Sequence, residues 1–200
     1  MEPQRAALDV LQNPARATSE RCVDPLSALE IDHELQLRLC NLLEHIADGL
    51  PGIEDPEVAM VAISVLRTGL EGHTAFEERH LFPLIRYRGS GDPVVEAILT
   101  QLEDEHDGDE AFAHELADEL ERLVSVGTAR NPEMLGYMLR GFFVGQRRHI
   151  EWENNTILPL ARNLLTGEDL MTLRQGLSKL PGPNTSRASL LSIETVGDYS

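Results

Sequence analysis

Residues 73–84 read HTAFEERHLFPL, and residues 149–160 read HIEWENNTILPL. Both stretches place a glutamate four residues after a histidine, and a Pro-Leu pair follows at the same distance in each. Residues four apart lie on one face of an α-helix. The repeat therefore predicts two related helices, each of which presents a histidine and a carboxylate side by side.

Four long segments with helical periodicity begin in the same way, with Asp or Asn followed directly by Pro. Asp and Asn side chains cap the free N–H groups of a first turn, and proline at the first helical position loses no hydrogen bond. The expected caps are Asp24, Asp55, Asp92 and Asn131. The expected helices span 25–49, 56–88, 93–126 and 132–165, with shorter helices at 168–179 and at 4–12.

Strand signals are nearly absent, and the connections between the four long segments are short. The sequence thus predicts an all-α fold, an antiparallel up-down-up-down four-helix bundle with a short C-terminal fifth helix. The bundle is expected over 24–180, between a flexible segment 1–23 and a mobile tail 181–200. Pro83 and Pro159 fall late in the second and fourth helices and should kink or loosen them.

Each of the four helices carries one apolar stripe, and each stripe contains a histidine. Counted from the helix starts, the four histidines lie within about 3–6 Å of one level of the bundle. A glutamate follows the histidine at i+4 in three of the helices. The predicted layer of inward side chains is His33, His73, Glu77, His106, Glu110, His149 and Glu153.

Three carboxylates inside a bundle require compensation, because an unpaired buried carboxylate costs several kcal/mol. A site of imidazole and carboxylate ligands with room for two metal ions is the simplest compensation. Nitrogen and oxygen donors without thiolate favour iron, manganese or zinc. No nucleophile or acid–base constellation stands outside this layer, so any catalysis would belong to the metal.

The composition limits the partners. The 200 residues include 34 acidic and 17 basic side chains, for a formal charge of −17. Such a surface repels nucleic acids and anionic membranes, and we expect neither as a partner. No apolar run reaches membrane-spanning length, no secretory signal precedes the first helix, and the two cysteines lack a metal or redox spacing, which together favour the cytoplasm. Acidic residues around His106, including Glu105, are expected to form a solvated face.

Four segments together resemble the hemerythrin-like (HHE cation-binding) family over about residues 25–180: DHELQLRLC, HTAFEERHLFPL, DEHDGDEAF and HIEWENNTILPLA. The resemblance implies a four-helix bundle around two non-haem iron ions, bridged by carboxylate and by oxo or hydroxo groups. It implies that one iron is held by His33 and His73. It implies that the other is held by His106 and His149, with Glu110 a candidate ligand beside them. Glu77 and Glu153 would bridge, and an open position would take dioxygen, peroxide or another small ligand.

The chain departs from the oxygen-carrying hemerythrins at two positions. Those proteins have histidine where Glu110 stands, and aspartate one residue beyond Glu153. An additional carboxylate makes iron more electron-rich and favours the ferric state. We therefore expect oxygen or peroxide chemistry, iron or redox sensing, or iron handling of the storage type, in preference to reversible oxygen transport.

Three alternatives remain open. A ferritin-like di-metal oxidase would use Glu-x-x-His pairs, which occur at Glu30–His33, Glu77–His80 and Glu103–His106. A regulatory binding module would use the same metal centre to gate a partner surface without turnover. A single zinc ion would need only four ligands. The remaining histidines, His45, His80 and His114, are expected outside the ligand set.

Overall fold

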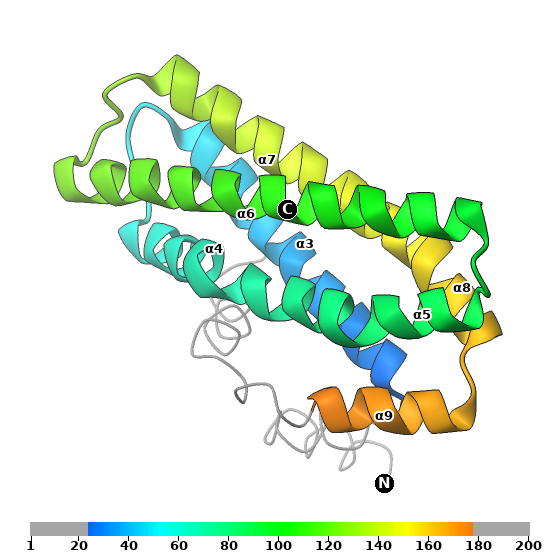
Figure 1. Ribbon diagram of the computed structural model, residues 1–200. Helices are drawn as coiled ribbons and strands as arrows, with labels where there is room; N and C mark the ends of the chain where they lie inside the picture. The colour runs from blue at the N-terminus through cyan, green and yellow to red at the C-terminus, as the bar shows by residue number, and fades with distance from the viewer. Residues whose placement is uncertain (1–23, 178–200) are drawn as a thin grey trace, which may run out of the picture.

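The computed structural model describes residues 24–177, and the predicted bundle is confirmed over this range (Figure 1). The predictions for 1–23, for the helix at 4–12 and for 178–200 lie outside the described residues. The helices are α3 (Pro25–Gly49), α4 (Pro56–Phe76), α5 (Phe82–Arg88), α6 (Pro93–Val126), α7 (Pro132–Trp152), α8 (Leu158–Leu164) and α9 (Gly167–Leu177), with π-helical turns η1 (Glu77–Leu81) and η2 (Glu153–Ile157).

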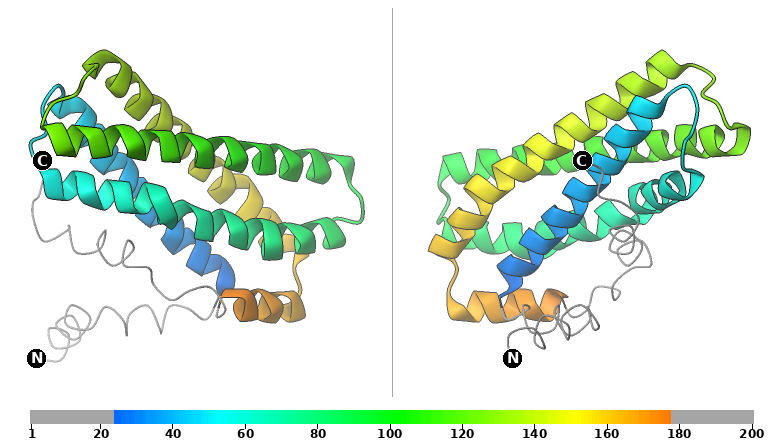
Figure 2. Two further views of the ribbon diagram at one scale, coloured as in Figure 1. Left: turned by 60° about the vertical axis from the view of Figure 1, so that its left-hand side comes forward. Right: turned by 180° about the vertical axis from the view of Figure 1, so that it is seen from behind.

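The bundle is built from two antiparallel pairs of long helices. α3 packs mainly on α7, and α4 packs mainly on α6. Figure 2 shows the two pairs crossing at an angle, with α9 lying across the end of the bundle where α3 begins. In this up-down-up-down order, α3 and α6 run in one direction while α4 and α7 run in the other.

All four predicted helix caps form. The Asp24 carboxylate accepts the Leu26 N–H at 3.1 Å, and Asp55 accepts the Glu57 N–H at 2.9 Å. Asp92 and Asn131 cap α6 and α7 in the same way, and proline occupies the first turn of each helix. These caps fix where each helix starts and hence the height at which its histidine enters the bundle.

The apolar interior is divided into two clusters. One cluster is centred on Leu39, Leu66 and Leu120, and the other on Leu29, Phe82 and Leu102. Along each long helix the inward histidine lies between residues of the two clusters. A polar layer is therefore closed off by packed side chains at both of its ends.

The expected disturbance by the two late prolines takes the form of a π-helical turn immediately before each. The Phe82 N–H donates to the carbonyl of Glu77, five residues back, and the Leu158 N–H donates in the same way to Glu153. Proline has no N–H to continue the regular ladder. The widened turns begin at the two glutamates of the repeat, and such single turns occur often at functional sites.

Helix α9 is held by a carboxylate with two sets of partners. Asp169 accepts the Thr166 backbone N–H at 2.8 Å and closes the first turn of α9 as a capping box. Arg88, at the end of α5, donates two hydrogen bonds to the same carboxylate, at 2.8 and 3.1 Å. At the far end of α9, Gly176 lies against His80 so closely that an added Cβ would be 3.0 Å from the ring.

Replacing Asp169 with asparagine should loosen α9 by about 1–3 kcal/mol, because the bidentate contact with Arg88 is lost. Arg88 holds the pKa of Asp169 well below its usual value of 3.8. A depressed folded-state pKa contributes stability that is present above pH 3.8 and is lost as the pH falls through the folded value. Hydrogen exchange of residues 167–177 should therefore separate the two proteins at neutral pH and less so in acid. Equal protection at neutral pH would contradict this role.

Candidate metal centre

Six of the seven residues predicted for the site converge in the polar layer. Their ligand atoms form two groups, each with all its atoms within 4.8 Å of one another. We call these the first half-site, made of His33, His73, Glu77 and Glu153, and the second half-site, made of His106, His149 and Glu153. Every member is buried, and Glu77 and Glu153 have no exposed surface.

In the first half-site, three side chains point at one another from three helices. The Nε2 atoms of His33 and His73 are 3.2 Å apart, and His33 Nε2 is 3.1 Å from Glu153 Oε2. Ligand atoms about 2.1 Å from one ion and at right angles to each other are about 3 Å apart. The spacing matches donors that share a metal ion.

The second half-site has fewer members, and its ligand atoms are more widely spaced. His149 Nε2 lies 3.3 Å from Glu153 Oε1, and His106 Nε2 lies 3.8 Å from the same oxygen. Glu77 approaches from the side, with its Oε2 atom 3.5 Å from His106 Nε2 and 3.4 Å from His73 Nε2. Each glutamate thus faces histidines of both half-sites, as the resemblance implied for bridging ligands.

The carboxylates of this layer contact histidine rings but form no hydrogen bond. Both oxygens of Glu77 and both of Glu153 are fully buried without a hydrogen bond, as is His106 Nε2. Leaving such groups unsatisfied costs about 1–3 kcal/mol each, and more when they are charged. Cations bound between the two carboxylates would satisfy all of them, so the residues present fit a metal centre.

The residue after each glutamate orients a histidine on a neighbouring helix. Asn154 Oδ1 accepts the His33 Nδ1 proton at 2.7 Å, and Glu78 Oε1 accepts the His106 Nδ1 proton at 2.9 Å. With Nδ1 engaged, each ring presents Nε2 to the interior. Metal-binding histidines are commonly oriented by such outer contacts.

The residue before a histidine contacts one of the other two rings by a hydrogen bond and lies near the second. Glu105, which precedes His106, accepts the His149 Nδ1 proton at 3.2 Å. Asp32, which precedes His33, has its Oδ2 atom 3.9 Å from His73 Nδ1. The expectation that Glu105 belongs to a merely solvated face is therefore incomplete, because its partly exposed side chain also contacts the site.

These contacts relate the two halves of the bundle by an approximate twofold exchange of α3 and α4 with α6 and α7. The two halves differ at one outer contact: the amide of Asn154 accepts from His33, whereas the carboxylate of Glu78 accepts from His106. The corresponding residues are His33 and His106, His73 and His149, Glu77 and Glu153, Asp32 and Glu105, and Asn154 and Glu78.

The two buried glutamates have opposite protonation behaviour. Burial, reinforced by the nearby charge of Glu153, raises the pKa of Glu77 well above its usual range. Burial acts on Glu153 in the same sense, but the three histidines that face its carboxylate together hold its pKa well below that range. Without metal, Glu77 therefore holds its proton more readily than Glu153.

The histidines complete this balance. Burial opposes the protonation of His149, yet Glu153 and Glu105 together raise its pKa to about 9. Burial lowers the pKa of His73. Protons thus supply positive charge in the metal-free layer, and metal binding would displace them.

Glu110 is not part of either group. It is exposed, and it lines a small cavity next to His106. The reason is topological: α6 runs opposite to α4 and α7, so the residue four positions after His106 lies on the other side of the histidine layer from Glu77 and Glu153. The antiparallel order of the helices was the signal that could have separated Glu110 from the two bridging glutamates.

The Glu-x-x-His pairs of the ferritin-like alternative are not assembled. Glu30 pairs with Arg162 at 2.8 Å, and Glu103 pairs with Arg86 at 2.7 Å. His80 packs beside Phe76 with ring centroids 5.5 Å apart. The structure gives this alternative no support.

Sequence reasoning missed the outer contacts and a buried amide pair, Gln36 and Gln146. The signal for them was position: each lies beside a ligand in the chain or one helical turn from a histidine.

A comparison with protein-family models matches residues 24–161 to the hemerythrin HHE cation binding domain. Comparisons with curated proteins and with solved structures found no match. Among residues 24–177, no helix combines the length and apolar character required to cross a bilayer.

Proposed function

The chain belongs to the hemerythrin HHE cation-binding family, and on that premise we propose that it holds two iron ions and uses them to bind or react with dioxygen or peroxide. One observation carries the proposal: two buried groups of histidine and carboxylate atoms share Glu153, and the buried carboxylate oxygens form no hydrogen bond, only contacts with the histidine rings of the layer. This donor set of nitrogen and oxygen atoms suits iron.

The protein's own residues determine how the centre works. The outer contacts of His33, His106 and His149 fix their ring orientations. The two apolar clusters pack on either side of the layer and leave a small polar cavity beside the histidines. Two iron ions held by these residues would supply electrons and bind a small oxygen molecule. The second half-site has fewer protein ligands and borders the cavity, so a small ligand would approach the centre from that side.

The test is an anaerobic ferrous titration of the metal-free protein. We expect about two ions per chain, as in other dinuclear carboxylate bundles, and a change in the optical spectrum when dioxygen or peroxide is added. Binding of one ion only, or no spectral response to either oxidant, would reject the proposal. A single zinc ion as the preferred metal would also reject it.

Because His33 contacts a neutral amide and His106 a carboxylate, we expect the two half-sites to bind metal with different affinities. Replacing Glu78 with glutamine should weaken metal binding at the second half-site by about 10–100-fold, because loss of an outer partner usually has this effect. Replacing Asn154 with aspartate makes the opposite change at His33 and should strengthen binding at the first half-site. Stepwise titration with cobalt(II), followed by visible spectroscopy, measures both. Identical titration curves for all three proteins would contradict the assignment.

One contact favours the second candidate function, a metal-gated binding module. The π-turn η1 carries Glu77 at its start and His80 near its end, and His80 lies against Gly176 of α9. A shift of Glu77 on metal binding would move η1 and, through the contact of His80 with Gly176, displace α9. Metal-dependent hydrogen exchange in 167–177 without peroxide or oxygen turnover would support this candidate over the first.

A further inference from the structure

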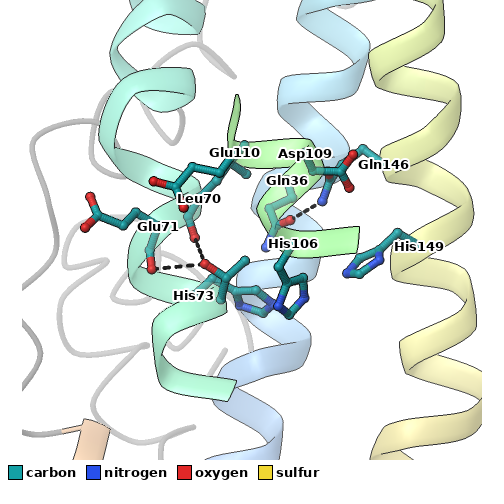
Figure 3. Close-up of a pocket in the computed structure, with 10 residues that line it drawn as sticks. Gln36, Leu70, Glu71, His73, His106, Asp109, Glu110, Gln146 and His149 are labelled. Carbon is teal, nitrogen blue, oxygen red and sulfur yellow. Dashed lines mark hydrogen bonds between the residues drawn. The ribbon is translucent and has the colours of Figure 1, made fainter. Parts of the chain in front are cut away.

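A small cavity of about 20 Å³ lies directly beside the histidine layer (Figure 3). It touches histidines of both half-sites, namely His73, His106 and His149. A volume of this size accommodates about one water-sized molecule. Any molecule within it would lie beside the more open second half-site.

The cavity has an unused hydrogen-bond donor. Gln146 Nε2 donates to Gln36 Oε1 at 2.7 Å, which joins α7 to α3 across the cavity. The Nε2 group of Gln36 is buried and has no partner, and the side chain is only 6% exposed. An orphaned buried amide donor costs about 1–3 kcal/mol, so the position favours a ligand that accepts a hydrogen bond.

Other residues that line the cavity carry carboxylates, and Figure 3 shows Asp109 beside Gln146. Asp109 and Glu110, from the turn of α6 that follows His106, line the cavity, and Glu71 lines it from α4. The described residues that line the cavity include no lysine or arginine. A small anion would be repelled there by like charge. A neutral molecule with O–H groups can instead donate to a carboxylate.

We propose that the cavity is a binding site for a small neutral hydroxylic ligand of the hydrogen peroxide class, held by Gln36 as donor and Asp109 as acceptor. Dioxygen can accept from Gln36 but has no proton for Asp109, and anions such as azide are repelled. This inference rests on the proposed metal function, since it narrows the oxygen ligand of that same centre.

Optical titration of the iron-loaded, oxidised protein with azide tests the charge argument without relying on turnover. Asp109→Asn should bind azide about tenfold more tightly than the wild type, because a carboxylate facing the cavity is removed. Asp107→Asn is the matched control: it makes the same change on an exposed residue of α6 that does not line the cavity. Equal azide affinity in all three proteins would overturn the proposal.

A second variant tests the donor. Replacing both members of the amide pair, Gln36→Leu with Gln146→Leu, leaves no partner unsatisfied and should preserve the fold. We expect the rate of the peroxide-induced spectral change, measured by stopped flow at low peroxide, to fall about tenfold, while the rate with dioxygen changes less. Equal losses with both oxidants would overturn the selectivity for peroxide.

The iron content of the proteins distinguishes failure of the cavity proposal from failure of the proposed metal function. If the variants and the wild type all bind about two iron ions but show no difference with azide or peroxide, the cavity proposal fails and the metal function stands. If the wild type itself binds no iron, the proposed function fails first.

Discussion

Replacing Glu153 with glutamine should reduce bound iron from about two ions per chain to less than one. Among residues 24–177, Glu153 is the only one common to both half-sites, and its two oxygens face His33 on one side and His149 on the other, at 3.1 and 3.3 Å. The amide keeps the volume of the side chain but offers a single neutral oxygen. Both ions therefore lose a charged ligand at once. Elemental analysis after anaerobic loading measures the effect.

The matched control is Glu151→Gln, an exposed glutamate two residues earlier on the same helix. It should retain the full iron content and the optical spectrum of the wild type. Glu110→Gln is informative as well, since Glu110 lies outside both groups but lines the adjacent cavity. Wild-type iron content in Glu153→Gln would refute the shared-ligand geometry.

Replacing Glu77 with glutamine should make the metal-free protein less sensitive to rising pH. Burial raises the pKa of Glu77 well above its usual value of 4.5. A group with a raised folded-state pKa contributes stability that is fully present below pH 4.5 and is lost as the pH rises through the folded value. Over that window the metal-free wild type should lose about 1.4 kcal/mol per pH unit relative to the variant. The glutamine resembles the protonated acid in shape and cannot ionise.

When metal is bound, the wild type should be more stable than Glu77→Gln. The wild type should be stabilised by iron, by about 2.7 kcal/mol when free metal exceeds the dissociation constant a hundredfold, whereas Glu77→Gln should gain much less. Thermal unfolding with and without metal, from about pH 5 to pH 8, gives both comparisons. Parallel pH curves for the two metal-free proteins would show that Glu77 is not the buried titrating acid.

Much of the architecture could be predicted because its causes are local. The cap residues Asp24, Asp55, Asp92 and Asn131, each with proline behind it, determine where the helices begin. The apolar stripes determine which face turns inward, and a histidine within a stripe turns inward with it. Counting residues from fixed starts was then enough to bring four histidines to one level.

The limits of that counting appear at Glu110. Glu110 follows His106 at the same spacing as Glu77 follows His73, so the sequence predicted both glutamates inside the same buried layer. The direction of α6 places Glu110 on the cavity side of the histidines, where it is exposed. The π-turns at η1 and η2 likewise depend on more than the presence of Pro83 and Pro159, because the register shift redistributes backbone hydrogen bonds over a whole turn.

By itself the sequence determined the helices, their inward faces and the chemical type of the buried ligands, since propensity, capping and periodicity act within a few residues. Only the tertiary structure decided which atoms share an ion, which outer side chain orients each imidazole, and where an unpaired amide faces open space. Those relations join residues from different helices, such as Asn154 with His33 and Gln146 with Gln36. They depend on how the helix pairs cross and at what height they pack, which no single segment specifies.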